Sequence, residues 1–95
     1  MYLHIGQNII INTNSIIGIF DMDSSTVKKS TRDFLYKKEK LGLTVNACSD
    51  LPKSFIVYKN FEDYKIFITS LNSSTLFKRV NTHFFKGEDF TNGIK

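Results

Sequence analysis

Two short segments rich in β-branched and aromatic residues, 54–59 and 64–69, stand close together in the second half of the chain. They are separated by Asn60-Phe61-Glu62-Asp63, a connection in which Glu62 and Asp63 are expected to be solvated turn residues. Strands joined by so short a connection pair with each other in antiparallel fashion. The two segments therefore predict a β-hairpin.

Three further strands are predicted nearer the N-terminus. Residues 2–5 and 9–12 flank the turn Gly6-Gln7-Asn8, and residues 12–15 supply a second turn. The run from Ile16 to Phe20 is continuously apolar and largely β-branched, a pattern typical of a strand covered on both faces. We therefore expect this run to form the centre of the sheet.

A helix is predicted from about Asp23-Ser24-Ser25, which offer N-cap side chains, to about Lys40, with Gly42 as its C-terminal stop. At 100° per residue Val27, Phe34 and Leu41 share a narrow arc with Leu35 beside it, which predicts a buried stripe. Lys38 falls near this stripe and must direct its amine outward. The opposite arc, expected to face solvent or a partner, contains Lys28, Lys29, Arg32, Tyr36 and Lys40.

After a loop through Cys48 and Pro52, residues 70–74 lead into a second, short helix. Its expected common face holds Leu76, Phe77, Val80 and Phe84, and residues 86–95 are expected to form a loose tail. A chain of 95 residues allows one compact domain. The pattern therefore predicts an α+β fold in a small mixed single domain, residues 1–85, with a mainly antiparallel sheet and two helices.

The positive charge of the chain is concentrated in one place. The segment from Lys28 to Lys40 holds six basic and two acidic residues, and its balance of +4 equals that of the whole chain. One basic element on an otherwise neutral body indicates an anionic partner. The alternative is a solvated face that serves solubility. A smaller basic pair, Lys78-Arg79, follows the hydroxyls of residues 73–75 and suits a phosphate, although helix capping alone explains those hydroxyls.

No pattern for catalysis or metal binding is visible. His4, His83 and Cys48 are not at ligand spacing from one another, so we expect no metal and no cofactor. Asp21 and Asp23 are a carboxylate pair at the end of a strand, but turn formation and capping explain them better than acid–base chemistry. Since nucleophile and phosphate-loop motifs are also lacking, we expect neither an enzyme nor a small-molecule substrate.

Cysteine usage and hydropathy bear on location. A single Cys48 forms no intramolecular disulfide, the N-terminus lacks a basic signal region, and no apolar run approaches the roughly 18 residues of a membrane span. We therefore expect a cytoplasmic protein without a membrane partner. Nine Phe residues in so short a chain favour burial of some of them against another copy.

Several segments in a fixed order carry a resemblance to a known family. They are residues 1–6, 16–21, 34–35, 52–54 and 71–79, which read MYLHIG, IIGIFD, FL, PKS and LNSSTLFKR. This set, within roughly residues 1–80, resembles the Rem extracellular-matrix regulators, and their RemB branch in particular. These are small bacterial proteins, found mainly in Firmicutes, whose RemA branch activates transcription of biofilm-matrix genes. The resemblance implies a cytoplasmic DNA-binding protein of low sequence specificity, with a LytTR-like fold and a homo-oligomeric ring.

The chain departs from the RemA branch at two basic positions. That branch has an Arg just before its central strand and a Gly-Arg-Arg-Thr-Arg run ahead of the hairpin, whereas this chain has Ser15 and, at 49–53, a run that keeps only Lys53. Either the basic helix and Lys78-Arg79 take over DNA contact, or the ring remains as an interaction scaffold without nucleic-acid binding. For duplex DNA we expect mostly phosphate contacts. The expected contact residues are Lys28, Lys29, Arg32, Lys40, Lys53, Lys78 and Arg79.

Overall fold

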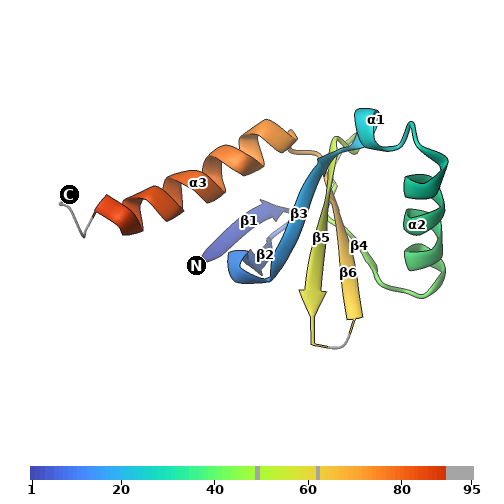
Figure 1. Cartoon of the computed structure of the whole chain (residues 1–95), viewed down its shortest axis with the longest axis horizontal. Helices are drawn as coiled ribbons and strands as arrows, with labels where there is room; N and C mark the ends of the chain where they lie inside the picture. Colours follow the sequence, from blue (N-terminus) through green and yellow to red (C-terminus); the bar gives the residue numbers. More distant parts are fainter. Residues whose placement is uncertain (49, 62, 90–95) are drawn as a thin grey trace.

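The computed structural model describes residues 1–48, 50–61 and 63–89, with the backbone alone for Asn60 and for residues 82–89. The strands are β1 (Tyr2–Gly6), β2 (Ile9–Asn12), β3 (Ile16–Asp21), β4 (Thr44–Asn46), β5 (Ser54–Asn60) and β6 (Asp63–Thr69). The helices are η1 (Thr13–Ser15, a 3-10 turn), α1 (Met22–Ser25), α2 (Lys29–Lys40) and α3 (Ser73–Asp89). The N-terminal strands come first along the chain, a helical segment follows β3, and α3 comes after the last three strands (Figure 1).

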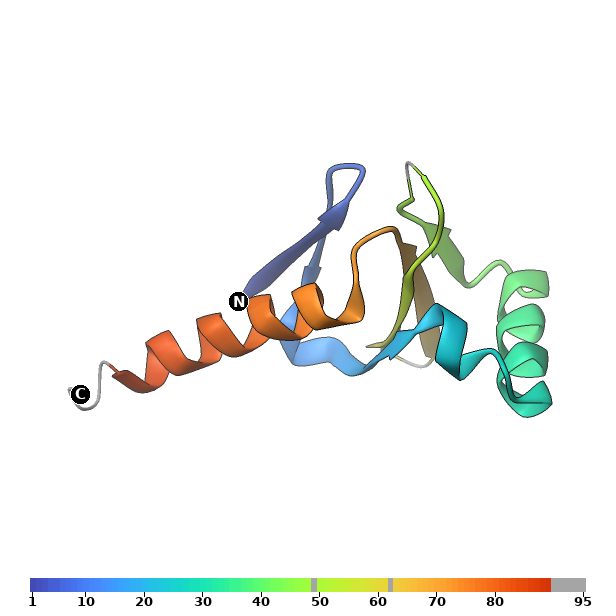
Figure 2. The same ribbon diagram turned by 90° about the horizontal axis from the view of Figure 1, so that it is seen from above.

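The strands form two sheets. The larger has the order β3-β5-β6-β4, and β1 pairs with β2 in a separate two-stranded sheet. All pairs are antiparallel except β4 with β6. The four-stranded sheet lies between α2 on one side and the β1–β2 hairpin with α3 on the other, as the two views in Figures 1 and 2 agree. The α+β class and the mainly antiparallel sheet are confirmed.

The core lies between the larger sheet, the β1–β2 hairpin and the first turns of α3. Strand alternation sends Ile19, Ile56 and Phe67, which are cross-strand neighbours, to this side of the sheet. They pack with residues of the hairpin, the end of β4 and α3, all of them buried: Leu3, Ile5, Ile11, Ala47 and Leu76.

The turn between β1 and β2 has the backbone conformation that its residues favour. Gly6, Gln7 and Asn8 have φ values of +121°, +51° and +61°, so three consecutive residues lie at positive φ. A Cβ atom on Gly6 would lie 2.7 Å from the carbonyl oxygen of Ala47. Glycine therefore lets this turn approach the chain that leaves β4, where Gln7 also donates a hydrogen bond to the carbonyl of Cys48.

The β5–β6 hairpin and the N-terminal strands are confirmed, but the place of β3 differs from the prediction. β3 is an edge strand, because β5 pairs with β3 on one side and with β6 on the other. Ile17 and Phe20 of β3 remain exposed. The predicted loop before Cys48 contains the short strand β4, which pairs parallel with β6. Three residues are too few to show a strand pattern in the sequence.

The predicted basic helix is divided into α1 and α2. Asp21 is the N-cap of α1, and its carboxylate accepts hydrogen bonds from the amide and the hydroxyl of Ser24. α2 then begins at Lys29, and Gly42 follows its end at φ +72°. Capping by the segment Asp23-Ser24-Ser25 was therefore a wrong prediction, since these residues lie inside α1, whereas the stop at Gly42 is confirmed.

The predicted buried stripe is wrong. Val27 is 73% exposed, Leu41 is 59% exposed and Phe34 is 37% exposed, and α2 has no buried residue. Val27 precedes α2 and Leu41 follows it, so the helical periodicity that grouped them with Phe34 does not apply to them. As a result, the face of the sheet toward α2 is only partly covered.

α3 is longer than the short helix expected and continues to Asp89. Leu76 is fully buried and Val80 packs on the core, whereas Phe77 is exposed. The side chain of Phe84 lies outside the part of the chain that the structure describes. α3 extends to Asp89, and residues 90–95 lie outside the described residues. The loose tail expected at residues 86–95 therefore stays a prediction. None of the helices found in the described ranges is long and apolar enough to cross a membrane.

Candidate functional site

Among the residues that the structure describes, exposed basic side chains are most concentrated on α2 and its N-cap. Lys28, Lys29, Arg32, Lys37 and Lys40 are all exposed. Lys37 was absent from the expected contact residues, although the concentration of charge between Lys28 and Lys40 points to it. Since an exposed lysine keeps its hydration and its full charge, this helix presents several cations that a polyanion can reach.

Lys38 is the exception among the lysines of α2. Its side chain is 13% exposed, and its Nζ lies 3.1 Å from Oδ1 of Asp63 at the start of β6. The same Nζ lies 5.7 Å from the ring centres of Phe34 and Tyr64. The backbone amide of Tyr64 and the Lys38 amine lower the pKa of the Asp63 carboxyl. Lys38 was expected to direct its amine outward past the stripe. Instead, its amine contacts Asp63 and so links α2 to β6.

Two of the expected contact residues on α2 are engaged inside the subunit. Nη1 of Arg32 donates hydrogen bonds to the carbonyls of Thr26 and Val27, both at 2.8 Å, and so holds the break between α1 and α2. Lys29 forms an exposed ion pair with Asp33 at 3.4 Å. Exposed pairs of this kind are weak, so Lys29 can exchange Asp33 for another anion, whereas Arg32 has a structural role as well.

The second basic cluster, Lys78 and Arg79, lies in the first turns of α3, a helix on the other side of the sheet from α2 (Figure 1). Both residues are exposed, and Nη1 of Arg79 donates to the carbonyl of His4 at 3.2 Å, which ties α3 to β1. The fold therefore does not merge the two basic clusters into one compact patch. A single polyanion reaches both only if it spans the subunit or several copies.

Lys53 is an exposed residue just before β5. Its backbone amide donates to the carbonyl of Thr69, and its carbonyl accepts from the amide of Met22. These two bonds place Lys53 between the end of β6 and the start of α1. The expected contact residues are thus spread over three elements: α2 with its N-cap, the loop before β5, and α3.

The candidates for metal or acid–base chemistry do not come together. Within residues 1–48, 50–61 and 63–81 there is no group of three or more His, Cys, Asp or Glu that could hold a metal ion. Asp21 caps α1, and the side chain of His83 is not described. Partial burial, with a smaller effect of Asp50, raises the pKa of the Cys48 thiol, which disfavours the reactive thiolate.

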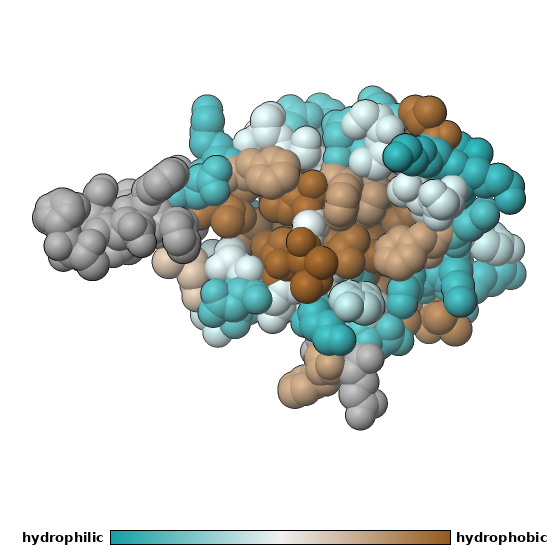
Figure 3. Space-filling model, viewed as in Figure 1, coloured by the Kyte–Doolittle hydropathy of each residue, from teal (hydrophilic) through white to brown (hydrophobic). Residues whose placement is uncertain are grey.

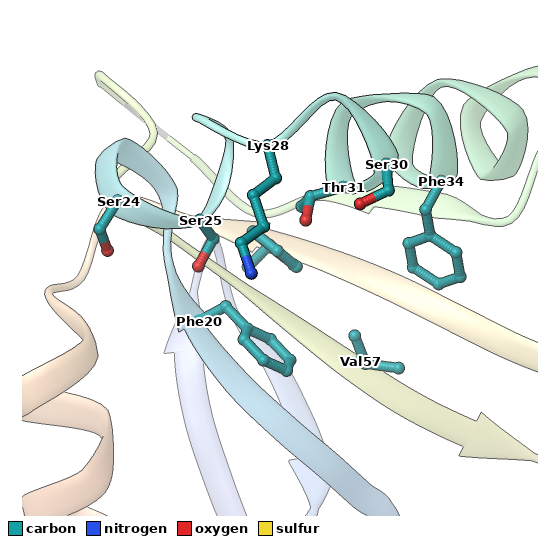
Figure 4. Close-up of a pocket in the computed structure, with 9 residues that line it drawn as sticks. Phe20, Ser24, Ser25, Lys28, Ser30, Thr31, Phe34 and Val57 are labelled. Atoms are coloured by element: carbon teal, nitrogen blue, oxygen red, sulfur yellow. The ribbon is translucent and has the colours of Figure 1, made fainter.

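One feature of the site is not indicated by the sequence pattern. Between α2 and the sheet lies an open groove of about 570 Å³, which we call the α2 groove (Figure 4). Apolar side chains gather on this face of the molecule in Figure 3. Its lining residues come from β3, α1, the N-cap and first turns of α2, and β5: Phe20, Ser24, Ser25, Lys28, Ser30, Thr31, Phe34, Phe55 and Val57.

The comparisons with known proteins agree with the resemblance seen in the sequence. The family model for RemA-like proteins, described as extracellular matrix regulatory protein A-like, matches residues 2–80. Extracellular matrix regulatory protein B of Bacillus subtilis (strain 168) is 35% identical over 85 residues, which cover 88% of this chain and 95% of that protein. The segment matched by the family model includes β1 to β6, α2 and the first turns of α3. The chain therefore belongs to the RemA-like family of extracellular matrix regulatory proteins.

Proposed function

We propose that this protein regulates extracellular matrix genes by binding duplex DNA in the cytoplasm as a homo-oligomer. The observation that carries the proposal is the row of exposed lysines on α2, of which Lys28, Lys37 and Lys40 form no salt bridge within the described residues. Phosphate contacts from lysines supply affinity without reading sequence. Low sequence specificity is therefore expected.

Assembly strengthens this mechanism. One subunit carries a net charge of only +4, and its basic clusters lie on α2 and α3, two helices on different sides of the sheet. Several copies side by side would present a longer basic surface, and affinity for DNA rises with the number of phosphates neutralised. A ring is the arrangement that family resemblance favours.

An interaction scaffold without DNA binding is the second candidate. It is favoured by apolar side chains left in solvent, including Val27, Leu41 and Phe61, the last of which is 93% exposed. Large exposed apolar groups are typical of protein contact surfaces. The α2 lysines would then serve solubility, as in the alternative stated for the basic segment.

A salt series separates the two candidates. Fluorescence anisotropy with a generic labelled duplex is measured between about 50 and 200 mM salt, and the logarithm of affinity is plotted against the logarithm of salt concentration; the DNA proposal requires a slope of about −0.9 per neutralised phosphate. A scrambled duplex of the same length should bind with similar affinity. Binding that is undetectable at the lowest salt would support the scaffold, and a slope near zero would exclude the electrostatic mechanism.

A further inference from the structure

The floor of the α2 groove is aromatic and partly open to solvent. Phe20 of β3 and Phe55 of β5 stack with ring centres 5.2 Å apart and planes at 21°. Phe20 is 40% exposed, and Phe34 faces it from α2, with Val57 between them in Figure 4. A groove of about 570 Å³ has the size typical of small-molecule sites. An aromatic ring or a short alkyl chain laid on this floor would shield the exposed rings of Phe20 and Phe34 from water, whereas Phe55 is already buried.

The rim of the groove is polar and carries one charge. The hydroxyl-bearing residues Ser24 and Ser25 come from α1, and Ser30 and Thr31 come from α2. Lys28 is the charged residue among those that line the groove, and its side chain extends over the floor toward Phe20 in Figure 4. It forms no salt bridge with any residue that the structure describes. The groove thus joins an apolar floor to a single cation.

We infer that the α2 groove binds a small amphipathic monoanion, a carboxylate with an aromatic ring or short alkyl chain. The apolar part would lie between Phe20 and Phe34, and the carboxylate would meet the amine of Lys28. One cation matches one negative charge, so a nucleotide or another multiply charged phosphate would leave charges without a partner in the groove. This inference goes beyond DNA binding. It does connect to it, because a bound carboxylate would neutralise one of the exposed lysines of the proposed DNA surface.

The test compares an acid with its neutral counterpart. The wild-type chain is titrated by calorimetry with 4-phenylbutyrate and, separately, with 4-phenylbutan-1-ol, which has the same ring and chain without the charge. We expect saturable binding of both, with the acid bound about two- to fivefold more tightly, the range for an exposed ion pair. In Lys28→Met this preference should disappear while the alcohol binds as before. Lys65→Met is the matched control. Ile66 is the cross-strand partner of Val57, which lines the groove, and strand alternation places the neighbouring Lys65 on the other face of the sheet. The preference for the acid should therefore persist in this variant.

Two further variants locate the ligand. Phe34→Ala should weaken the acid and the alcohol equally, and Ser30→Trp, at an exposed rim position that does not hold the fold, should block both by filling the groove. Circular dichroism and thermal unfolding establish that each variant is folded. Absence of 4-phenylbutyrate binding, equal affinity for acid and alcohol in the wild type, or unchanged binding in folded Ser30→Trp would overturn the inference. If the groove instead closes on a second copy of the chain, neither compound should give a calorimetric signal with the wild type. The assembly formed by Ser30→Trp should then have a lower mass in solution than that of the wild type. Binding of duplex DNA is measured in a separate experiment, so a failure of the DNA proposal is distinguishable from a failure of the inference that the groove binds a carboxylate.

Discussion

The hydroxyl of Thr69 donates a hydrogen bond to the carbonyl oxygen of Ile5 at 2.6 Å, across 64 positions of the sequence. Thr69 ends β6 in the larger sheet, whereas Ile5 lies in β1 of the smaller one. The hydroxyl oxygen of Thr69 also accepts a hydrogen bond from the amide of Leu71. Thr69 and Ile5 are both fully buried. This one side chain therefore joins the two sheets and fixes the chain that leads into α3.

Thr69→Val should lower the free energy of unfolding by about 1–3 kcal/mol, because the buried carbonyl and amide would lose their partner. The matched control is Thr44→Val. The buried hydroxyl oxygen of Thr44 has no hydrogen-bond partner among the described residues, so the same change there should leave stability unchanged or raise it. Urea unfolding followed by circular dichroism measures both. Equal losses in the two variants would contradict the linking role of Thr69.

Gly6→Ala should destabilise the protein more than Gly42→Ala. Both positions have positive φ, which costs an alanine about 1–2 kcal/mol. At Gly6 the added Cβ would also meet the carbonyl oxygen of Ala47 at 2.7 Å, whereas at Gly42 it meets nothing within 4 Å. Thermal unfolding of the two variants makes the comparison, and a Gly42→Ala loss as large as that of Gly6→Ala would be evidence against close packing of the β1–β2 turn.

The Asp63 carboxylate, which accepts a hydrogen bond from the amide of Tyr64 and pairs with Lys38, should make stability depend on pH in the acid range. The pKa of Asp63 in the folded state is lowered from its ordinary value of 3.8, so the folded state favours the carboxylate. The stabilisation is present above 3.8 and is lost as the pH falls through the lowered pKa. The difference in stability between the wild type and Asp63→Asn should therefore shrink as the pH falls below 3.8. A difference that stays constant over this range would show that the folded state does not favour the ionised form of Asp63.

Removing the exposed lysines of α2 should reduce the salt dependence of DNA binding. In the variant Lys28→Gln/Lys37→Gln/Lys40→Gln, the slope of log affinity against log salt should become shallower by up to about 2.7, since each lost phosphate contact contributes about 0.9. Arg32 is left in place because it holds the break between α1 and α2. Lys65→Gln is a charge control on another element. An unchanged slope in the triple variant would assign the α2 lysines to solubility.

The mass in solution should be several times that of the 11.0 kDa chain. Apolar residues left in solvent, such as Val27 and Leu41, favour association of copies. Light scattering at micromolar concentration in moderate salt measures this mass. A monomer under these conditions would contradict assembly, and with it the extended DNA surface that assembly is proposed to create.

Local patterns were enough to predict most of the strands and the family. The hairpin of β5 and β6, the turn at Gly6 and the strand β2 follow from alternation, β-branching and turn residues, which act over a few neighbouring positions. The concentration of lysines between Lys28 and Lys40 likewise predicted an exposed basic helix. The ordered segments from residue 1 to residue 79 predicted the family, which the comparisons confirmed.

Only the tertiary structure decided which surfaces are covered and which charges are free. Whether β3 lies at the centre or the edge depends on how β5 pairs with two partners, and no local pattern records this. Lys38 and Arg32 resemble their basic neighbours in sequence, yet one is held by Asp63 and the other by two backbone carbonyls. Val27 and Leu41 lie outside α2, and of the three residues of the expected stripe only Phe34 lines the α2 groove. Contacts between distant segments set burial, and burial separates the side chains that hold the fold from those that remain free to bind.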